Sequence, residues 1–155
     1  MFPNRPGGGV AATQGRDAGA RTGRPVMLKR KILIVDDNVT LSRLLRQQLE
    51  ALHEFSVRVE NQPAMALALM RTFQPDLVIL DVMMPEVDGG MVAAQMKVDL
   101  DLAETPVIFL TGSVRKEEVE DKQGLIGGMT FLAKPVDFDQ LLDCIDRLVP
   151  ARRSG

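Results

Sequence analysis

The stretch that decides the fold is ILIVDD at residues 32–37, in which four apolar residues are followed at once by two acids. The same pattern recurs three times along the chain, as LVIL before Asp81, VIFL before Thr111 and FLA before Lys134. Continuously apolar runs are typical of strands in a parallel sheet whose two faces are both covered by helices. Because the carboxyl ends of such strands meet at one edge of the sheet, we expect these polar side chains to converge there.

Amphipathic segments alternate with the apolar runs, and their periodicity predicts helices. The segment 57–60 instead alternates apolar and charged residues, which indicates a half-exposed edge strand. Five strand–helix units in this arrangement predict an α/β fold with a doubly wound, five-stranded parallel sheet. Placing the edge strand beside the first strand leads to the strand order 2-1-3-4-5.

Four helices are expected from the pattern, with the strongest start signal at Asp137, three residues before Gln140. A fifth, between 113 and 124, is highly charged with few apolar anchors, and we expect it to be loosely packed and mobile. The other expected helices are one with Leu41, Leu44, Leu45, Leu49 and Leu52 on its apolar face, one from Pro63 through Met70, and one that follows Gly89 and Gly90 and runs through Met96.

Composition indicates one domain with a real core. The chain has 155 residues, of which 45% are hydrophobic and 26% charged, and its net charge of −2 argues against direct DNA binding. The single Cys144 fits a reducing cytoplasm, and no apolar run approaches the ~20 residues of a membrane span. We therefore expect a cytoplasmic protein with no membrane contact.

The predicted domain covers residues 29–150, between a disordered Gly-, Arg- and Pro-rich tail at 1–28 and a frayed end at 151–155. A true start at Met27 would also account for the unusual tail, and a basic docking arm is the functional alternative. So few residues follow the domain that we expect no effector domain after it, and hence output through a partner protein.

The converging groups favour phosphoryl chemistry. Two carboxylates about 5 Å apart repel by roughly 3 kcal/mol at an effective dielectric of 20, which a hard cation such as Mg²⁺ relieves. Asp36, Asp37 and Asp81 are the candidate ligands, and Asp81 is also the candidate nucleophile, since carboxylates form aspartyl-phosphates. Lys134 and Thr111 would contact phosphoryl oxygens, the first as a cation and the second as a hydroxyl donor.

These motifs together resemble the receiver domain of bacterial two-component response regulators, over about residues 30–149. The acidic pair 36–37, the loop 81–89, the pair 111–112 and the dipeptide 134–135 each resemble a motif of that family. Phe131, three residues before the lysine, is similar to its switch aromatic.

The resemblance implies a flavodoxin-like fold and phosphorylation of Asp81 by a sensor histidine kinase or a histidine phosphotransfer protein. It implies Mg²⁺, with Mn²⁺ as a substitute, held by Asp37, Asp81 and the Met83 carbonyl, with Asp36 acting through water. It also implies a switch, in which Thr111 moves toward the phosphate, Phe131 turns inward, and the face formed by the last two helices and the fifth strand changes its affinity for a partner. Such a domain is a phosphoacceptor and not an enzyme with an external substrate.

Two other functions are compatible with parts of the pattern. A phosphatase of the haloacid-dehalogenase type uses similar groups, but it has a second acid where Met83 stands, and its acidic pair comes late in the chain. A phosphorylation-independent interaction module could keep the receiver fold alone. A flavodoxin is disfavoured because Asp36 and Asp37 would repel the flavin phosphate.

Overall fold

The computed structural model describes residues 27–112, 125–126 and 129–153, and the chain divides into two units. In the smaller unit, the two-residue strands β1 (Met27–Leu28) and β8 (Arg152–Arg153) pair in antiparallel fashion. These strands fall in segments that the sequence analysis assigned to the tails, and the domain boundaries stay a prediction. The larger unit, Lys29–Ala151, contains the main sheet and the helices.

The main sheet has the predicted parallel order. Its parallel strands are β2 (Arg30–Val35), β3 (Phe55–Glu60), β4 (Leu77–Asp81), β5 (Val107–Thr111) and β7 (Met129–Ala133). They lie in the order β3-β2-β4-β5-β7, which is 2-1-3-4-5 when they are counted along the chain. A short strand that was not predicted, β6 (Leu125–Ile126), pairs antiparallel with β7. At the opposite edge lies β3, as its alternating pattern predicts.

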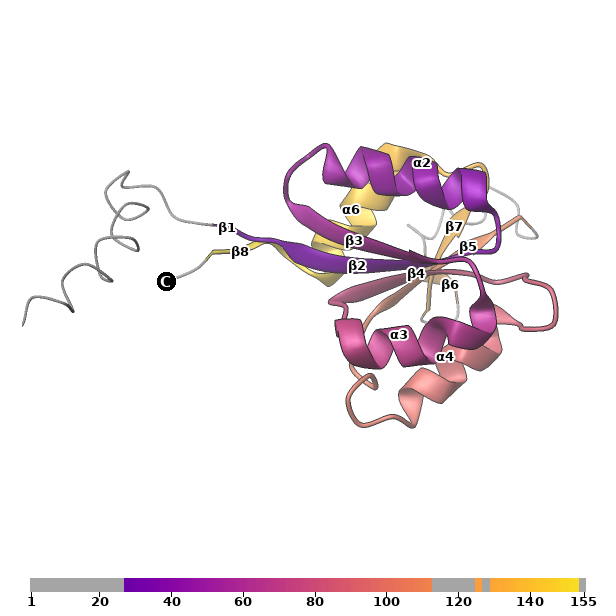
Figure 1. Ribbon diagram of the computed structural model, residues 1–155. Helices are drawn as coiled ribbons and strands as arrows, with labels where there is room; N and C mark the ends of the chain where they lie inside the picture. Colours follow the sequence, from indigo (N-terminus) through magenta and orange to yellow (C-terminus); the bar gives the residue numbers. More distant parts are fainter. Residues whose placement is uncertain (1–26, 113–124, 127–128, 154–155) are drawn as a thin grey trace, which may run out of the picture. The chain divides into compact units, whose positions relative to one another are not determined.

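Helices cover both faces of this sheet (Figure 1). On one face lie α2 (Val39–Glu50) and α6 (Phe138–Leu148), and on the other lie α3 (Ala66–Phe73) and α4 (Gly89–Lys97). Successive residues of β2 therefore point into different cores. Ile32 and Ile34 belong to the cluster under α2 and α6, whereas Leu33 and Val35 belong to the cluster under α3 and α4. This two-sided burial is why the strands are continuously apolar.

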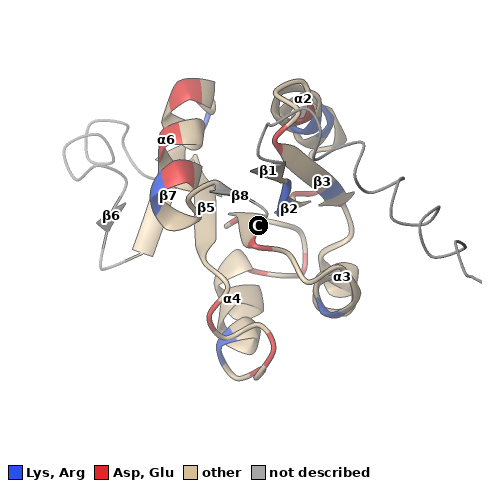
Figure 2. Ribbon diagram, turned by 90° about the vertical axis from the view of Figure 1, so that its left-hand side faces the viewer, with Lys and Arg blue, Asp and Glu red and all other residues tan. Residues whose placement is uncertain are grey.

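Each of the three longest helices in the described part of the chain begins at a polar cap. The side chains of Asn38, Asp88 and Asp137 accept hydrogen bonds from backbone N–H groups in the first turns of α2, α4 and α6. The donor to Asp137 is the N–H of Gln140, so the predicted start of the last helix is confirmed. Along α6, acidic residues recur every three or four positions, at Asp139, Asp143 and Asp146 (Figure 2).

Three predicted details of the helices were wrong. Leu44 is half exposed because it points away from the buried stripe of α2, and Leu52 is exposed because α2 ends at Glu50, before it. Pro63 opens a short 3₁₀ turn, η1 (Pro63–Met65), and α3 begins only at Ala66. Gly89 and Gly90 do not precede α4 but form its first turn. The helix expected between 113 and 124 lies outside the described residues.

Arg30 ties the opposite, amino-terminal end of the sheet to α6. Its guanidinium, only 2% exposed, donates to Asp146 at 2.7 Å, to Glu54 at 2.8 Å and to the Val149 carbonyl at 3.0 Å. It also lies 4.5 Å from the centre of the Phe55 ring, a cation–π distance. Among the described helices, none has the length and apolar character needed to cross a membrane.

Candidate functional site

The strand register brings the predicted polar residues to one edge of the sheet. Val35 pairs with Leu80, so Asp36 follows its strand at the level of Asp81. Asp81 pairs in turn with Leu110, the residue before Thr111. Because Thr111 pairs with Ala133, Lys134 follows at the same edge. Residues 98 positions apart in the chain, Asp36 and Lys134, are thereby brought into contact.

The ammonium group of Lys134 lies between two buried carboxylates. Its Nζ is 3.2 Å from Asp81 Oδ1 and 3.3 Å from Asp36 Oδ2, and the acid side chains are 5% and 1% exposed. The backbone N–H of Lys134 donates to the Thr111 carbonyl at 2.9 Å, which holds the start of the β7–α6 loop against β5. The Lys134–Pro135 peptide bond is cis.

Asp36 and Lys134 both have raised pKa values. Burial raises the pKa of Asp36, and the nearby charge of Asp81 raises it further, against the lowering effects of the Asn38 backbone N–H and of Lys134. Burial by itself would lower the pKa of Lys134, but the charges of Asp36 and Asp81 outweigh it, and the pKa is raised. The acids therefore hold the lysine in its charged form.

Asp36, Asp37 and Asp81 have the composition of a magnesium site. Each offers an oxygen, and these oxygens lie within 4.8 Å of one another. Three carboxylates and one ammonium leave two negative charges, which a divalent cation would neutralise. Asp36 Oδ2 is buried, and although the Lys134 ammonium lies 3.3 Å away, it accepts no well-aligned hydrogen bond from the described residues, so a lone pair is left for a cation. All donors are hard oxygens, which Mg²⁺ prefers, and the residues therefore fit that ion.

The loop after Asp81 is held close to the carboxylate. The N–H of Met83 donates to Asp81 Oδ1 at 3.3 Å, and Met83 forms a β-bridge with Asp88. The side chain of Met83 is 69% exposed. At the far end of the loop, Gly89 donates to the Val82 carbonyl at 2.8 Å. A Cβ atom on Gly89 would lie 2.3 Å from the Asp81 carbonyl oxygen, so only glycine lets α4 begin this close to β4.

Thr111 and Gly112 border the carboxylates at the end of β5. Thr111 is buried, and a Cβ atom added to Gly112 would meet no described atom within 4 Å. Among the described residues, none would therefore be displaced by a side chain at Gly112.

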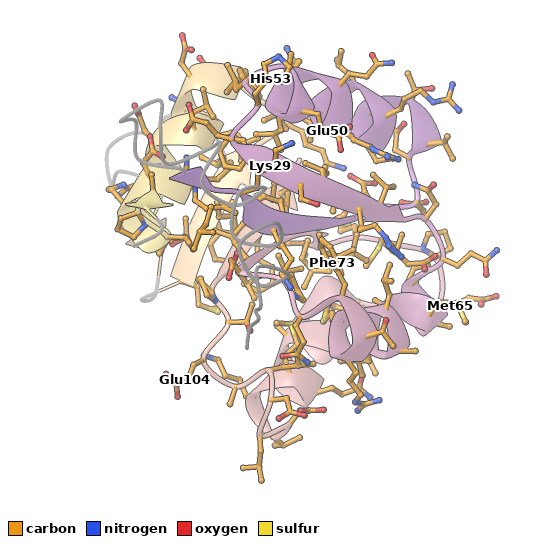
Figure 3. All side chains as sticks on the ribbon, turned by 60° about the vertical axis from the view of Figure 1, so that its left-hand side comes forward. Lys29, Glu50, His53, Met65, Phe73 and Glu104 are labelled. Carbon is orange, nitrogen blue, oxygen red and sulfur yellow. The ribbon has the colours of Figure 1, made fainter. Side chains whose placement is uncertain are left out.

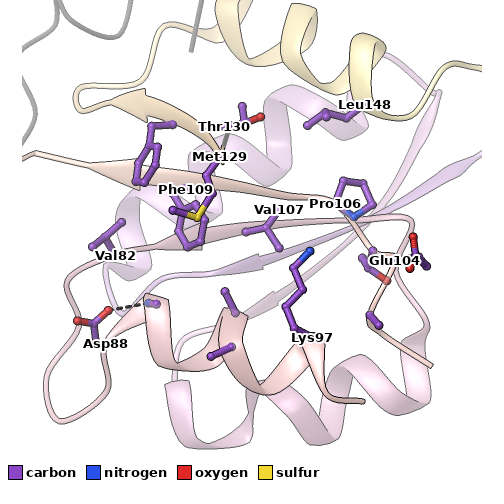
Figure 4. A pocket seen from close by; sticks show the side chains of 16 residues that line it. Val82, Asp88, Lys97, Glu104, Pro106, Val107, Phe109, Met129, Thr130 and Leu148 are labelled. Atoms are coloured by element: carbon purple, nitrogen blue, oxygen red, sulfur yellow. Dashed lines mark hydrogen bonds between the residues drawn. The ribbon is translucent and has the colours of Figure 1, made fainter. Parts of the chain in front are cut away.

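Phe131 lies between the core and a groove. Its ring stacks on that of Phe109, with 5.0 Å between ring centres and 23° between ring planes. Both rings line a groove of about 550 Å³ that runs from Val82 and Asp88 past Lys97 to the end of α6 (Figure 4). The aromatic expected to switch therefore packs against the sheet at the wall of an apolar groove.

Neither His53 nor Cys144 belongs to the acidic cluster. His53 is exposed beyond the end of α2 (Figure 3), with a left-handed backbone φ of 59°. Cys144 is buried against the core, and its Sγ accepts a hydrogen bond from Arg147.

Sequence reasoning missed two polar residues near the site, Asn61 and Ser42. Asn61 directly follows β3, and its side chain donates to the Asp36 carbonyl at 2.7 Å and to Ser42 Oγ at 2.9 Å. A polar residue at the end of an edge strand looks like an ordinary loop residue, so the only available signal was its place at the carboxyl edge.

Known proteins share both this sequence pattern and this fold. The family model of the response regulator receiver domain matches residues 32–146. The polar-differentiation response regulator DivK of Brucella anthropi is 32% identical over 119 residues, which cover 76% of this chain and 94% of DivK. The DNA-binding dual master transcriptional regulator RpaA of Synechocystis sp. is 36% identical over 115 residues, which cover 72% of this chain and 46% of RpaA. The chain spans about half the length of the curated transcriptional regulators that it matches.

A solved structure of a receiver domain has a similar fold. The signal receiver domain of a DNA-binding response regulator protein from Colwellia psychrerythraea superposes with a TM-score of 0.65 at 32% identity, covering 78% of this chain and 98% of that one. The family match, the relatives and the shared fold lead to one conclusion: this chain belongs to the family of response regulator receiver domains.

Proposed function

We propose that this chain accepts a phosphoryl group on Asp81 and in response changes its affinity for a partner protein. The observation that carries the proposal is the contact of one lysine ammonium with two buried carboxylates, Asp36 and Asp81, at 3.3 and 3.2 Å. Burying two acids side by side costs free energy, so their presence at this edge of the sheet supports a function that requires the pair. Receiver domains are signalling domains and not classical enzymes, and the proposal assigns this chain no external substrate.

Asp81 is the proposed nucleophile. Its carboxylate oxygen would attack the phosphorus of a phosphohistidine, forming a P–O bond while the P–N bond breaks and the leaving imidazole takes a proton. The ammonium of Lys134, already 3.2 Å from Asp81 Oδ1, would pair with an oxygen of the transferred group. The hydroxyl of Thr111 would donate to another, and the small Gly112 beside it, whose added Cβ atom would meet no described atom within 4 Å, would leave room for it.

A divalent cation would be held by Asp36, Asp37, Asp81 and the backbone carbonyl of Met83, with Asp36 acting through water. When bound, Mg²⁺, or Mn²⁺ in its place, would neutralise charge on the carboxylates and on the incoming phosphoryl oxygens. The buried Asp36 oxygen without a hydrogen bond supports this assignment, as does the small separation of the three acids.

The proposed switch connects this site to a partner surface. Thr111 ends β5, and Phe131 lies on the adjacent strand β7, stacked on Phe109. A shift of Thr111 toward the phosphate would free space that Phe131 can fill, and the surface of β7 and α6 would change with it. The other helix assigned to that surface falls at residues 113–124, outside the described part of the chain.

Proposed partners are a sensor histidine kinase or a histidine phosphotransfer protein upstream and a partner protein downstream. Direct DNA binding and membrane binding are not proposed for this domain, and the cytoplasmic location expected from the sequence stays a prediction. The family match removes the support for a haloacid-dehalogenase-type phosphatase. A phosphorylation-independent module is the remaining alternative.

Intact-mass measurement after incubation with acetyl phosphate and Mg²⁺ tests the proposal. The parent protein should gain one phosphate, and Asp81→Asn should gain none, while Asp101→Asn, a change at an exposed acid after α4, should behave like the parent. Lys134→Ala should gain markedly less phosphate than the parent at equal time. If neither acetyl phosphate nor a phosphorylated histidine phosphotransfer protein modifies the parent, the chain acts as a phosphorylation-independent module.

A further inference from the structure

The side-chain amide of Asn61 links three elements at the carboxyl edge of the sheet. Asn61 is the residue after β3, and its Nδ2 donates to the backbone carbonyl of Asp36 at 2.7 Å. The same nitrogen donates to Ser42 Oγ at 2.9 Å, on α2. Ser42 is fully buried, and its hydroxyl donates to the Val39 carbonyl at 3.1 Å. Both hydrogens of the Asn61 amide are therefore used in directed contacts.

The bond to Asp36 lies where the sheet no longer holds the chain. The ladder between β2 and β3 ends at the pair Val35–Glu60, after which the N–H of Asp36 donates to the Glu60 carbonyl at 3.2 Å. The carbonyl of Asp36 points onward to Asn61, so a side chain takes the place of the next bond between the strands.

Asp36 is also held on its other side. Its Oδ1 accepts from the N–H of Asn38 at 2.9 Å, and the side chain of Asn38 in turn caps α2 by accepting from Leu41. The backbone of Asp36 is thus fixed by Asn61 and its carboxylate by Asn38. The remaining oxygen, Oδ2, is left facing Lys134 without a hydrogen bond.

We propose that Asn61 is a positioning residue for the acidic pair. By holding the Asp36 carbonyl, it sets the backbone direction from which the carboxylates of Asp36 and Asp37 face Asp81. The contact of Asn61 with the acidic pair is its bond to the Asp36 backbone, so the proposed action on a bound cation runs through Asp36. The inference rests on the proposed function, because it assigns Asn61 a role in the cation site of that function.

Variants of Ser42 and Asn61 distinguish a positioning role of Asn61 from a packing role. Ser42→Ala removes the contact with α2 but leaves the donor to Asp36 in place, whereas Asn61→Ala removes both. Asn61→Leu keeps the branched shape of the side chain and removes both donors, which provides a second variant if the alanine variant folds poorly. Gln62→Ala is a matched control, since Gln62 is the exposed neighbour and makes no side-chain cap.

The test is a titration of each unphosphorylated protein with MgCl₂, followed by amide NMR shifts of residues around Asp81, with thermal unfolding in EDTA as a separate measure of stability. Loss of a group that orients a metal ligand weakens metal binding about 10- to 100-fold. We expect Asn61→Ala and Asn61→Leu to raise the Mg²⁺ Kd by about tenfold. We expect Ser42→Ala to stay within about twofold even though it lowers the melting temperature, and Gln62→Ala to match the parent.

Three results would overturn the inference. One is an unchanged Mg²⁺ Kd in both Asn61 variants, and another is a Kd raised as much by Ser42→Ala as by Asn61→Ala. The third is that both Asn61 variants are unfolded in EDTA, which would make the residue structural. If the parent itself binds no Mg²⁺, the cation site of the proposed function fails together with the inference. If the parent binds Mg²⁺ and the Asn61 variants bind it with the same Kd, only the inference fails.

Discussion

Replacing Gly89 with alanine tests whether the close approach of α4 to β4 holds the phosphoacceptor loop in shape. A Cβ atom at this position would lie 2.3 Å from the Asp81 carbonyl oxygen and 3.0 Å from Val82 Cα. Both contacts are with backbone, which cannot rotate away as a side chain can. The start of α4 would have to retreat by about 0.7 Å to bring the first contact to 3.0 Å, and this would strain the bond from Gly89 to the Val82 carbonyl.

The neighbouring Gly90 provides the matched control. A Cβ atom there would lie 3.1 Å from Asp88 Oδ1, a side-chain atom that can shift by a few tenths of an ångström. Both alanines gain about 0.5–1 kcal/mol from lower backbone entropy of the unfolded chain, so the difference between the variants isolates the clash. Forcing extra atoms into a packed site costs about 1–3 kcal/mol. We therefore expect Gly89→Ala to be about 1–3 kcal/mol less stable than Gly90→Ala, or about 4–12 °C lower in melting temperature.

Urea unfolding followed by far-UV circular dichroism is the appropriate assay, because the chain has no Trp or Tyr for intrinsic fluorescence. Phosphorylation by acetyl phosphate should also slow in Gly89→Ala, since the shifted carbonyl belongs to the acceptor residue Asp81. Equal stability of the Gly89 and Gly90 variants would refute the reasoning, because it would mean that the loop and α4 move apart without cost.

Three further predictions concern other parts of the larger unit. Asp36→Asn should raise the urea midpoint of the metal-free protein at pH 7. Burial and the charge of Asp81 raise the pKa of Asp36, so its ionised form opposes folding. The gain in stability should shrink as the pH falls toward 3.8, the usual pKa of an aspartate. Urea titrations at neutral and acidic pH measure it, and a variant less stable than the parent at pH 7 would contradict it. Met83→Asn should speed loss of phosphate from Asp81 at least about tenfold, since the exposed methionine offers no group to orient the attacking water, and mass spectra taken over time would record the decay. Arg30→Ala should lower the free energy of unfolding by about 2 kcal/mol through the loss of buried hydrogen bonds and packing. Glu54→Gln should cost less than about 1 kcal/mol, because the Glu54 carboxylate is half exposed. Equal losses of stability in urea unfolding would argue against this account of Arg30.

The parallel strands were predictable because their signal is local. Each is an apolar run buried on both faces. Most of these runs are followed or ended by a polar residue, which stands out in the sequence because a polar side chain is costly to bury. The edge position of β3 was predictable for the same reason, since its residues alternate between core and solvent. From these runs alone, the convergence of Asp36, Asp81 and Lys134 followed from the geometry of a parallel sheet.

Boundaries and faces of helices were less predictable. The exposure of Leu44 depends on which stripe of α2 meets the sheet, and the sequence offers several overlapping apolar stripes. The pair Gly89-Gly90 was taken as a break before α4, because glycine usually weakens helices. In the structure, Gly89 belongs to the helix and is required by a backbone contact with β4.

What the sequence by itself determined is the order of strands, the two-layered covering of helices and the set of chemical groups at the carboxyl edge. What only the tertiary structure decided is the environment of those groups: the buried Asp36 oxygen without a hydrogen bond, the amide of Asn61 on the Asp36 carbonyl, and the approach of Gly89 to Asp81. The physical reason is the separation along the chain of the residues that interact. Periodic burial is written into neighbouring residues, whereas a hydrogen bond across 25 positions depends on how whole elements pack, and no local pattern encodes that distance.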